Sequence, residues 1–151
     1  MDNNRFTLFA SVHILFLKEG KILLSLRKNV SSNGLYGLVA GHIDGGETVT
    51  QTIIRETKEE AGIDLKPEDF EITTVCHSFS RHNQKEFIQF YAVCKSWQGE
   101  IVNNEPEKCS ELKFFPVESL PQNIVPYLKD AINKVIKGVK FYEYGWQPNE
   151  E

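Results

Sequence analysis

The sequence predicts an α/β fold in which a mixed β-sheet lies between α-helices. Stretches rich in β-branched and aromatic residues, separated by turn residues, recur along most of the chain and are typical of strands. Two segments, 48–62 and 124–137, instead place apolar residues at helical spacing, one early and one late. The chain has 151 residues, 40% of them hydrophobic, and no repeat or linker divides it. A single domain over residues 1–151 is therefore expected.

Two hairpins and one further strand are expected. Residues 7–17 and 22–26 read as adjacent strands joined by the turn "KEGK", and the polar stretch 27–37 reads as a surface loop. Residues 71–79 and 86–94 flank the turn-forming "SRHNQK" and predict an antiparallel pair. The run "ELKFFP" at 111–116 predicts a strand that ends at proline.

The two helices have recognisable ends and faces. Thr48 with Gln51 three residues later is a capping-box pattern, and Gly62 is typical of the position just past a helix end. The later helix has an apolar face at helical spacing, formed by Val125, Leu128, Ile132, Val135 and Ile136.

Composition excludes several classes of function. The 17 basic and 21 acidic residues give a net charge of -4, which argues against broad electrostatic binding of nucleic acid polymers. Cys76, Cys94 and Cys109 show no CxxC pattern, which favours a reducing compartment. Residues 1–20 lack a basic n-region and a cleavage site, and no apolar stretch approaches the roughly 20 residues of a membrane span. We expect a cytoplasmic protein without a membrane segment.

Three glutamates crowd one stripe of the first helix. At about 100° per residue, Glu56, Glu59 and Glu60 lie beside the apolar face, and like charges four residues apart destabilise a helix by a few tenths of a kcal/mol. A bound Mg²⁺, which prefers oxygen ligands, would remove this repulsion. The alternative is an ordinary solvated acidic face.

The spacing around these glutamates resembles the signature of the Nudix hydrolases. A glycine, five residues, a glutamate and seven residues precede R-E-x-x-E-E-x-G and an aliphatic residue. Thr57 departs from the pattern, because an aliphatic residue usually stands there. On the core side its hydroxyl would need a partner, for which the carbonyl one turn back is the expected acceptor. The matching residues are Gly41, Glu47, Arg55, Glu56, Glu59, Glu60, Gly62 and Ile63.

This resemblance implies a Nudix fold, a Mg²⁺ or Mn²⁺ cofactor and attack of water on a phosphorus of a nucleoside diphosphate linked to another group. Glu56, Glu59 and Glu60 would be metal ligands together with the carbonyl of Gly41. Arg55 would orient Glu56 or pair with Glu47. A glutamate of the helix, or a carboxylate from another loop, would accept the proton.

Other candidates come with plain structural alternatives. Glu105 in "NNEPEKCSELKFFP" lies in a segment similar to one in nucleoside triphosphate pyrophosphohydrolases of this family, and we count it among the catalytic candidates with Arg55, Glu56 and Glu59. Arg27 is placed to hold a phosphate tail, and His42 to touch substrate, although each could equally be an ordinary surface or loop residue. Phe79, Phe87 and Tyr91 could stack on a base or belong to the core.

The substrate class is harder to derive. No proline stands about fifteen residues beyond the signature, as in many ADP-ribose pyrophosphatases, and the "SQPWPFPxS" run of NADH-cleaving members is absent. We therefore expect a small-molecule nucleoside triphosphate, undamaged or oxidised, to be split into monophosphate and pyrophosphate. Alternatives are a nucleotide sugar, ADP-ribose or a dinucleotide, or a non-catalytic nucleotide sensor. The protein could be a monomer or a homodimer.

Overall fold

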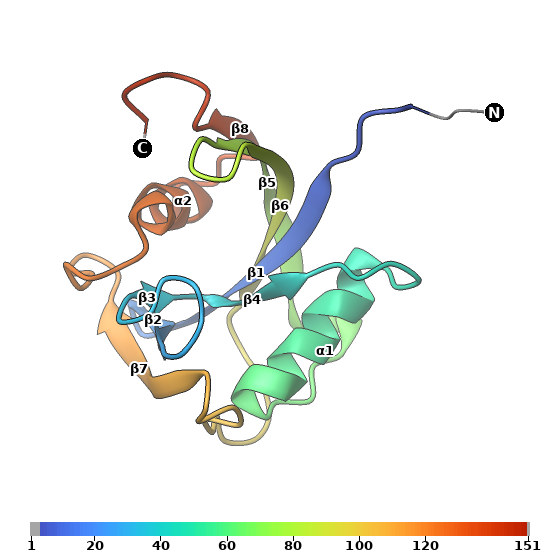
Figure 1. Cartoon of the computed structure of the whole chain (residues 1–151). Coiled ribbons are helices and arrows are strands. Elements are labelled where there is room, and N and C mark those ends of the chain that lie inside the picture. The colour runs from blue at the N-terminus through green and yellow to red at the C-terminus, as the bar shows by residue number, and fades with distance from the viewer. Residues whose placement is uncertain (1–3, 151) are drawn as a thin grey trace.

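The computed structural model describes residues 4–150 and contains a mixed eight-stranded sheet (Figure 1). The strand order is β3-β2-β1-β6-β5-β8, with β4 paired to β1 and β7 paired to β2. Two pairs, β1 with β6 and β5 with β8, are parallel, and the others are antiparallel. The strands are β1 (Phe9–Lys18), β2 (Lys21–Arg27), β3 (Tyr36–Gly37), β4 (Val39–His42), β5 (Glu71–Ser80), β6 (Lys85–Cys94), β7 (Cys109–Pro116) and β8 (Phe141–Tyr144).

Two helices cover opposite faces of this sheet, as Figure 1 shows, and confirm the predicted layers. They are α1 (Val49–Ala61) and α2 (Pro126–Ile136), and a short 3-10 helix, η1 (Pro67–Asp69), follows α1. Along β1, Val12 and Ile14 pack with Ile53 of α1, whereas Leu15 packs with Leu128 of α2. This alternation follows from the two-residue period of a strand, and it makes β1 the central layer of two separate hydrophobic clusters.

Both hairpins are confirmed, and one predicted loop is partly wrong. The β1–β2 and β5–β6 pairs are antiparallel. The polar segment 27–37 was expected to be surface loop throughout, yet its last two residues form β3 against β2. Tyr36 is only 9% exposed because its ring enters the cluster beneath α2, and its hydroxyl donates to Glu111 Oε1 at 2.6 Å. An aromatic side chain thus draws the end of the loop into the sheet.

The described residues also bear on the expectations about membrane segments and cysteines. No helix between residues 4 and 150 is long and apolar enough to cross a membrane. All three cysteines are buried and unpaired. Residues 1–3 of the N-terminal segment, and residue 151 of the predicted 1–151 domain, lie outside the described residues.

The caps of α1 are those that the sequence predicts. The Thr48 side chain accepts from the Gln51 backbone N–H, and the Gln51 side chain accepts from the Thr48 backbone N–H at 2.8 Å. At the other end Gly62 has a φ of 69° and donates its N–H to the Lys58 carbonyl. A left-handed backbone conformation at this position favours glycine, because glycine lacks a Cβ. The helix is therefore fixed at both ends by local sequence.

The expected partner of the Thr57 hydroxyl is absent. Thr57 is fully buried, yet its Oγ1 makes no hydrogen bond to any residue between 4 and 150, so the predicted contact with the carbonyl one turn back is wrong. The same helix contains a contrasting residue, because the buried Thr52 Oγ1 does donate to the Thr48 carbonyl at 3.0 Å. A buried hydroxyl without a partner destabilises a fold by about 1–3 kcal/mol.

We predict that Thr57→Val increases the free energy of unfolding by about 1 kcal/mol, because it removes an unpaired hydroxyl and keeps the branched shape. Thr52→Val is the matched control on the same helix. It should lower the free energy of unfolding by about 1 kcal/mol, since it removes a hydrogen-bonded hydroxyl. Urea denaturation of both variants measures the two effects, and equal changes in the same direction would contradict the assignment.

Candidate active site

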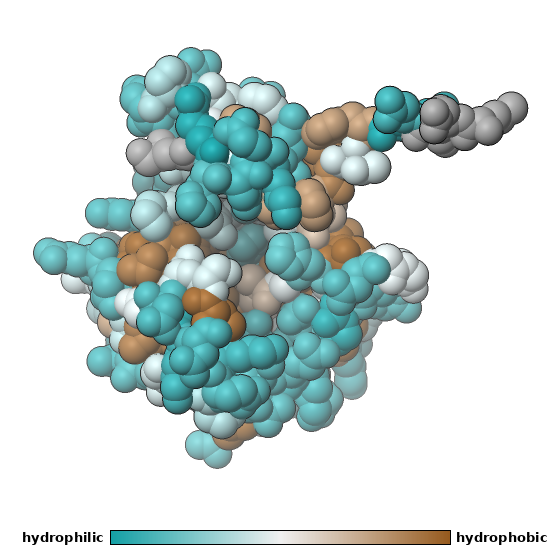
Figure 2. Space-filling model, viewed as in Figure 1, coloured by the Kyte–Doolittle hydropathy of each residue, from teal (hydrophilic) through white to brown (hydrophobic). Residues whose placement is uncertain are grey.

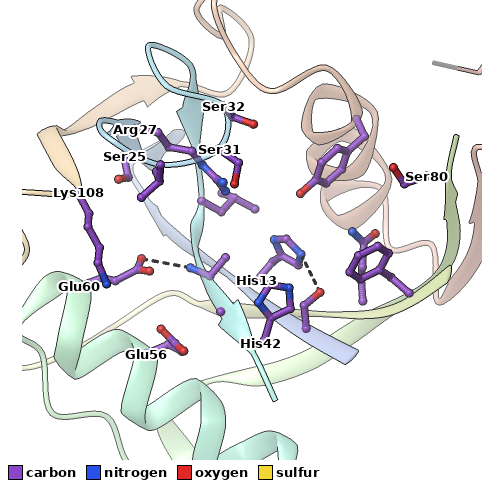
Figure 3. Close-up of a pocket in the computed structure, with 18 of the residues that line it drawn as sticks. His13, Ser25, Arg27, Ser31, Ser32, His42, Glu56, Glu60, Ser80 and Lys108 are labelled. Carbon is purple, nitrogen blue, oxygen red and sulfur yellow. Dashed lines mark hydrogen bonds between the residues drawn. The ribbon is translucent and has the colours of Figure 1, made fainter. Parts of the chain in front are cut away.

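The glutamates of α1 form one wall of a large cavity of about 930 Å³. Figure 2 shows its mouth as a recess bordered by both hydrophilic and hydrophobic residues, and Figure 3 shows the side chains inside. The lining comes from both halves of the fold: the first half supplies β1, β2, β4 and α1, and the second supplies β5, β6, the loop before β7 and the start of α2. All of the candidate residues, Arg27, Gly41, His42, Arg55, Glu56, Glu59, Glu60 and Glu105, line this cavity.

Arg55 connects the loop before α1 to the carboxylates on α1. Its Nε and Nη2 bind the two carboxylate oxygens of Glu47 at 3.0 and 2.7 Å, while Nη1 binds Glu56 Oε1 at 2.8 Å. The Nη2 atom also donates to the His42 carbonyl at 3.3 Å. Hydrogen bonding by Arg55 lowers the pKa of Glu47 to about 2. Arg55 thus pairs with Glu47 and orients Glu56 at the same time, whereas the sequence left these two roles as alternatives.

Gly41 lies where the backbone of β4 meets the Glu56 side chain of α1. A Cβ at this position would collide with the carboxyl group of Glu56. The absence of a side chain therefore allows the Glu56 carboxylate to sit directly against β4. This contact puts the backbone of Gly41 and the side chain of Glu56 at the same point of the cavity wall, as the resemblance implies for metal ligands.

Glu60 is the most perturbed carboxyl group of the site. Its Oε2 accepts from the Ala40 N–H at 3.2 Å, the dashed line at the left of Figure 3. Burial, followed by the neighbouring Glu56, raises the pKa of Glu60 to about 8. Burial also raises the pKa of Glu56, although Arg55 opposes this effect. Without a cation, the helix therefore holds two carboxyl groups that resist ionisation together.

Glu59 and Glu105 are placed differently. The Glu59 side chain is 50% exposed and lies 3.5 Å from Arg55 Nη1. Glu105 belongs to the loop before β7 and pairs with Lys108 at 3.2 Å. Its charge contributes to the raised pKa of both Glu56 and Glu60. The structure therefore brings Glu105 to the carboxylates of α1, 45 or more residues away along the chain.

The side chains suit a shared metal ion better than a closed metal cage. Within residues 4–150 no group of three or more His, Cys, Asp or Glu side chains is arranged to hold a metal ion by itself. Arg55 draws Glu56 and Glu59 to one side, while Glu60 points to the Ala40 N–H. Mg²⁺ commonly uses one or two carboxylates, waters and substrate phosphates. The oxygen donors and the raised pKa of Glu60 fit such an ion, and the metal role of Gly41, Glu56, Glu59 and Glu60 remains a prediction.

Arg27 and His42 lie at the ends of two different strands that border the cavity. Arg27 ends β2 at an irregularity in the pairing with β7, and its guanidinium packs over Gly37, where a Cβ would collide with it. His42 ends β4, exposed at the rim, with its ring 6.4 Å from that of Phe87. Both line the cavity, so both can contact a ligand, and their substrate-binding role remains a prediction.

Sequence reasoning missed several lining residues. Lys108 adds a cation beside Glu105. On the sheet, Ser11, His13 and Gln89 are buried polar residues that face the cavity. Ser11 and His13 interrupt an apolar run of the sequence, and a polar residue on a buried strand was the available signal. Of the three aromatic candidates, Phe79 and Phe87 line the cavity, whereas Tyr91 is fully buried in the core.

Comparisons with known proteins agree with this site. The model of the NUDIX domain family matches residues 7–135. An NAD-capped RNA hydrolase NudC from Stutzerimonas stutzeri is 32% identical over 120 residues, which cover 76% of this chain and 41% of that protein. An ADP-ribose pyrophosphatase from Methanocaldococcus jannaschii is 33% identical over 105 residues, or 70% of this chain and 60% of that protein. The match thus spans less than two thirds of either relative.

A solved structure shows the same fold. A MutT NUDIX hydrolase from Burkholderia pseudomallei superposes with a TM-score of 0.77 and 25% identity, covering 86% of this chain and 99% of that one. The family match extends over most of the chain, and it includes the loop and helix that carry Gly41, Arg55 and the glutamates. The chain belongs to the NUDIX domain family.

Proposed function

We propose that this Nudix hydrolase cleaves the diphosphate of a nucleotide joined to a second organic group, such as ADP-ribose or a dinucleotide, with Mg²⁺ or Mn²⁺ as cofactor. One observation carries the proposal. The cavity continues from the carboxylates of α1 to a second end with aromatic side chains, so that it has room on both sides of a diphosphate. The aromatic residues at that end are Phe79, Phe87, Tyr127 and Tyr144.

The choice of substrate class reverses the order that the sequence favoured. A nucleoside triphosphate was the first expectation, because the marks of other subclasses are missing. The relatives named above are instead an NAD-capped RNA hydrolase and an ADP-ribose pyrophosphatase, which supports the alternative. This chain lacks the "SQPWPFPxS" run, so we propose the wider class of ADP-ribose and dinucleotides and do not single out NADH.

The roles of individual residues follow from their positions. Glu56 and Glu60, with the Gly41 carbonyl, would hold the metal ion, and Arg55 keeps Glu56 in place. The metal supplies charge neutralisation at the phosphate oxygens and a lower pKa for an attacking water. Arg27 and Lys108 provide positive charge for the diphosphate on the side of the cavity facing the glutamates. Glu59 or Glu105, which have the more exposed carboxylates, would accept the proton from water.

The ligand we propose is a small molecule. The net charge of -4 gives no general attraction for a nucleic acid polymer, although relatives that act on NAD-capped RNA make a capped 5′ end a reasonable second substrate to assay. A cytoplasmic location, and the choice between monomer and homodimer, remain predictions from the sequence.

The direct test is hydrolysis by the purified protein with Mg²⁺ of a panel containing ADP-ribose, NAD, NADH, a nucleotide sugar, NAD-capped RNA and the nucleoside triphosphates. Product identification by mass spectrometry separates the classes. AMP with a second monophosphate supports the proposal, whereas a nucleoside monophosphate with pyrophosphate, from triphosphates only, would restore the first expectation. Absence of hydrolysis throughout the panel would overturn the proposed function.

We predict that Glu60→Gln and Glu56→Gln each lower kcat by about 100-fold or more, because each removes a charged oxygen needed to hold the metal. Glu68→Gln, on the exposed surface at η1, is the matched control and should retain full activity. Steady-state kinetics at saturating Mg²⁺ and thermal melting of each variant provide the measurement. A folded Glu60→Gln variant with unchanged kcat would refute the metal-ligand assignment.

We predict that only one of the two variants Glu59→Gln and Glu105→Gln removes the proton acceptor, and that the pH–rate profile shows which one. Removing a general base lowers kcat by about 10²–10⁴-fold and removes the acidic limb of the pH–rate profile. Removing the other carboxylate should leave that limb in place. The pH dependence of kcat for both variants gives the answer, and an intact acidic limb in both would exclude both residues as the base.

We predict that metal affinity rises with pH up to about 8. The raised pKa of Glu60 means that the metal-free group is largely protonated at neutral pH, so binding a cation must release a proton. One released proton gives at most about a tenfold gain in affinity per pH unit. In the metal-free protein, the stability associated with protonated Glu60 is complete below about pH 4.5 and is lost as pH rises through about 8.

The measurement is titration with Mn²⁺ between pH 6 and 8, followed by calorimetry in two buffers that differ in ionisation enthalpy. Wild type should release protons on binding, and Glu60→Gln should show weak binding with a flat pH dependence. An affinity of the wild type that does not change over this range would contradict the raised pKa of Glu60.

A further inference from the structure

The end of the cavity beyond the carboxylates has a polar floor that the hydrolytic site does not use. His13 on β1 is 3% exposed, and Figure 3 shows it projecting into the cavity. Its Nε2 lies 3.4 Å from Ser11 Oγ, while its Nδ1 is buried and makes no hydrogen bond to any described residue. A buried polar atom that faces a cavity without a partner points to a ligand that supplies the partner.

The protonation of His13 can be derived from its surroundings. Burial, with Arg27 and His42 nearby, lowers the pKa of His13 to about 3, so the ring is neutral and carries one N–H. If that N–H were on Nδ1, the protein would bury an unpaired donor, which is the rarer kind of unsatisfied group. The Nε2–H tautomer instead donates to Ser11 Oγ and leaves a lone pair on Nδ1. His13 therefore offers an acceptor.

Gln89 on the neighbouring strand offers a donor. It is directly opposite Ser11 in the β1–β6 register, is 8% exposed and lines the same cavity. Its Oε1 accepts from the Tyr91 hydroxyl at 3.4 Å, which leaves the Nε2 amide hydrogens for a ligand. An acceptor and a donor thus lie on adjacent strands of one cavity, diagonal to each other, because Tyr91 and not Gln89 is directly opposite His13.

Aromatic side chains enclose this pair. Tyr91 stacks beneath the His13 ring, with centroids 4.8 Å apart and planes 17° apart, and holds its orientation. Tyr127 at the start of α2 presents its edge to the His13 ring at 6.3 Å. Phe79 and Phe87 line the same end of the cavity. Such walls favour a flat ring, and the paired acceptor and donor favour a ring edge with an N–H next to a ring nitrogen.

We propose that this end of the cavity binds the adenine ring of the substrate, whose 6-amino group donates to His13 Nδ1 while an adjacent ring nitrogen accepts from Gln89 Nε2. The proposal rests on the proposed function, because it identifies one half of the diphosphate substrate. Both sites belong to one cavity and are linked through β4: His13 is opposite Ala40 in the β1–β4 register, and the Ala40 N–H binds Glu60. The ring site and the phosphate site are thus one strand apart.

The kinetic test compares ADP-ribose with its hypoxanthine analogue, in which an oxygen replaces the 6-amino group. Wild type should prefer ADP-ribose in kcat/KM by tenfold or more, because the analogue leaves His13 Nδ1 unpaired. His13→Phe should keep the stack on Tyr91, lose about tenfold on ADP-ribose and show no preference between the two. His82→Phe, in the exposed turn between β5 and β6, is the matched control and should behave as wild type.

Hydrolysis of both substrates without a preference in wild type, or a preference that survives in His13→Phe, would overturn the adenine assignment and leave the proposed function intact. A complete lack of hydrolysis would overturn the proposed function. The adenine assignment would then be tested by ligand binding alone. In ¹⁵N-labelled wild type, AMP should shift the His13 Nδ1 resonance upfield, whereas ribose 5-phosphate should not. An unmoved Nδ1 signal at saturating AMP would refute the proposal, and this measurement needs no variant that might fold poorly.

Discussion

The geometry of the carboxylate wall depends on the guanidinium of Arg55. One planar group with a fixed fork of donors binds Glu47 in the loop before α1, Glu56 on the helix and the carbonyl of His42 at the end of β4. Three separate segments are thereby held to one point. Because these bonds are charge-assisted and directional, they define where the loop meets the helix more closely than apolar packing could. A lysine would carry the same charge without the fork.

Glu60 differs from Arg55, because its burial makes the ionised form of the side chain unfavourable. Arg55 relieves the charge of Glu56, but among residues 4–150 the Glu60 carboxylate accepts a hydrogen bond only from the Ala40 backbone N–H, at 3.2 Å. The fold therefore contains a carboxyl group whose ionisation is unfavourable until a cation approaches. In this wall Glu56 is held in place by Arg55, whereas Glu60 lacks a compensating charge until a cation approaches. This arrangement suits an ion that arrives with its substrate and leaves with its products.

Much of the site could be predicted because its information is local. The capping residues Thr48 and Gly62 set the ends of α1, and the spacing along one helix sets the stripe of glutamates. The polar floor could not be predicted in the same way. His13 stacks on Tyr91, and Ser11 lies opposite Gln89, only because β1 pairs in parallel with β6, a strand more than 70 residues later. No local pattern specifies such pairing, and the missing partner of Thr57 likewise depends on side chains that the helix alone does not define.

The C-terminal segment has a consequence for association between molecules. Without β8, the strand β5 would present a row of free backbone groups, which is a template for pairing with other chains. Four residues of β8 cover the part of that row from Val75 to Ser78 in parallel register, and the indole N–H of Trp146, just after β8, donates to the His77 carbonyl. Gly145 makes the crossing feasible, since a Cβ there would strike the Phe79 carbonyl. Loss of these last residues would expose an adhesive edge and would also remove Tyr144 from the cavity lining, so the tail serves both solubility and the site.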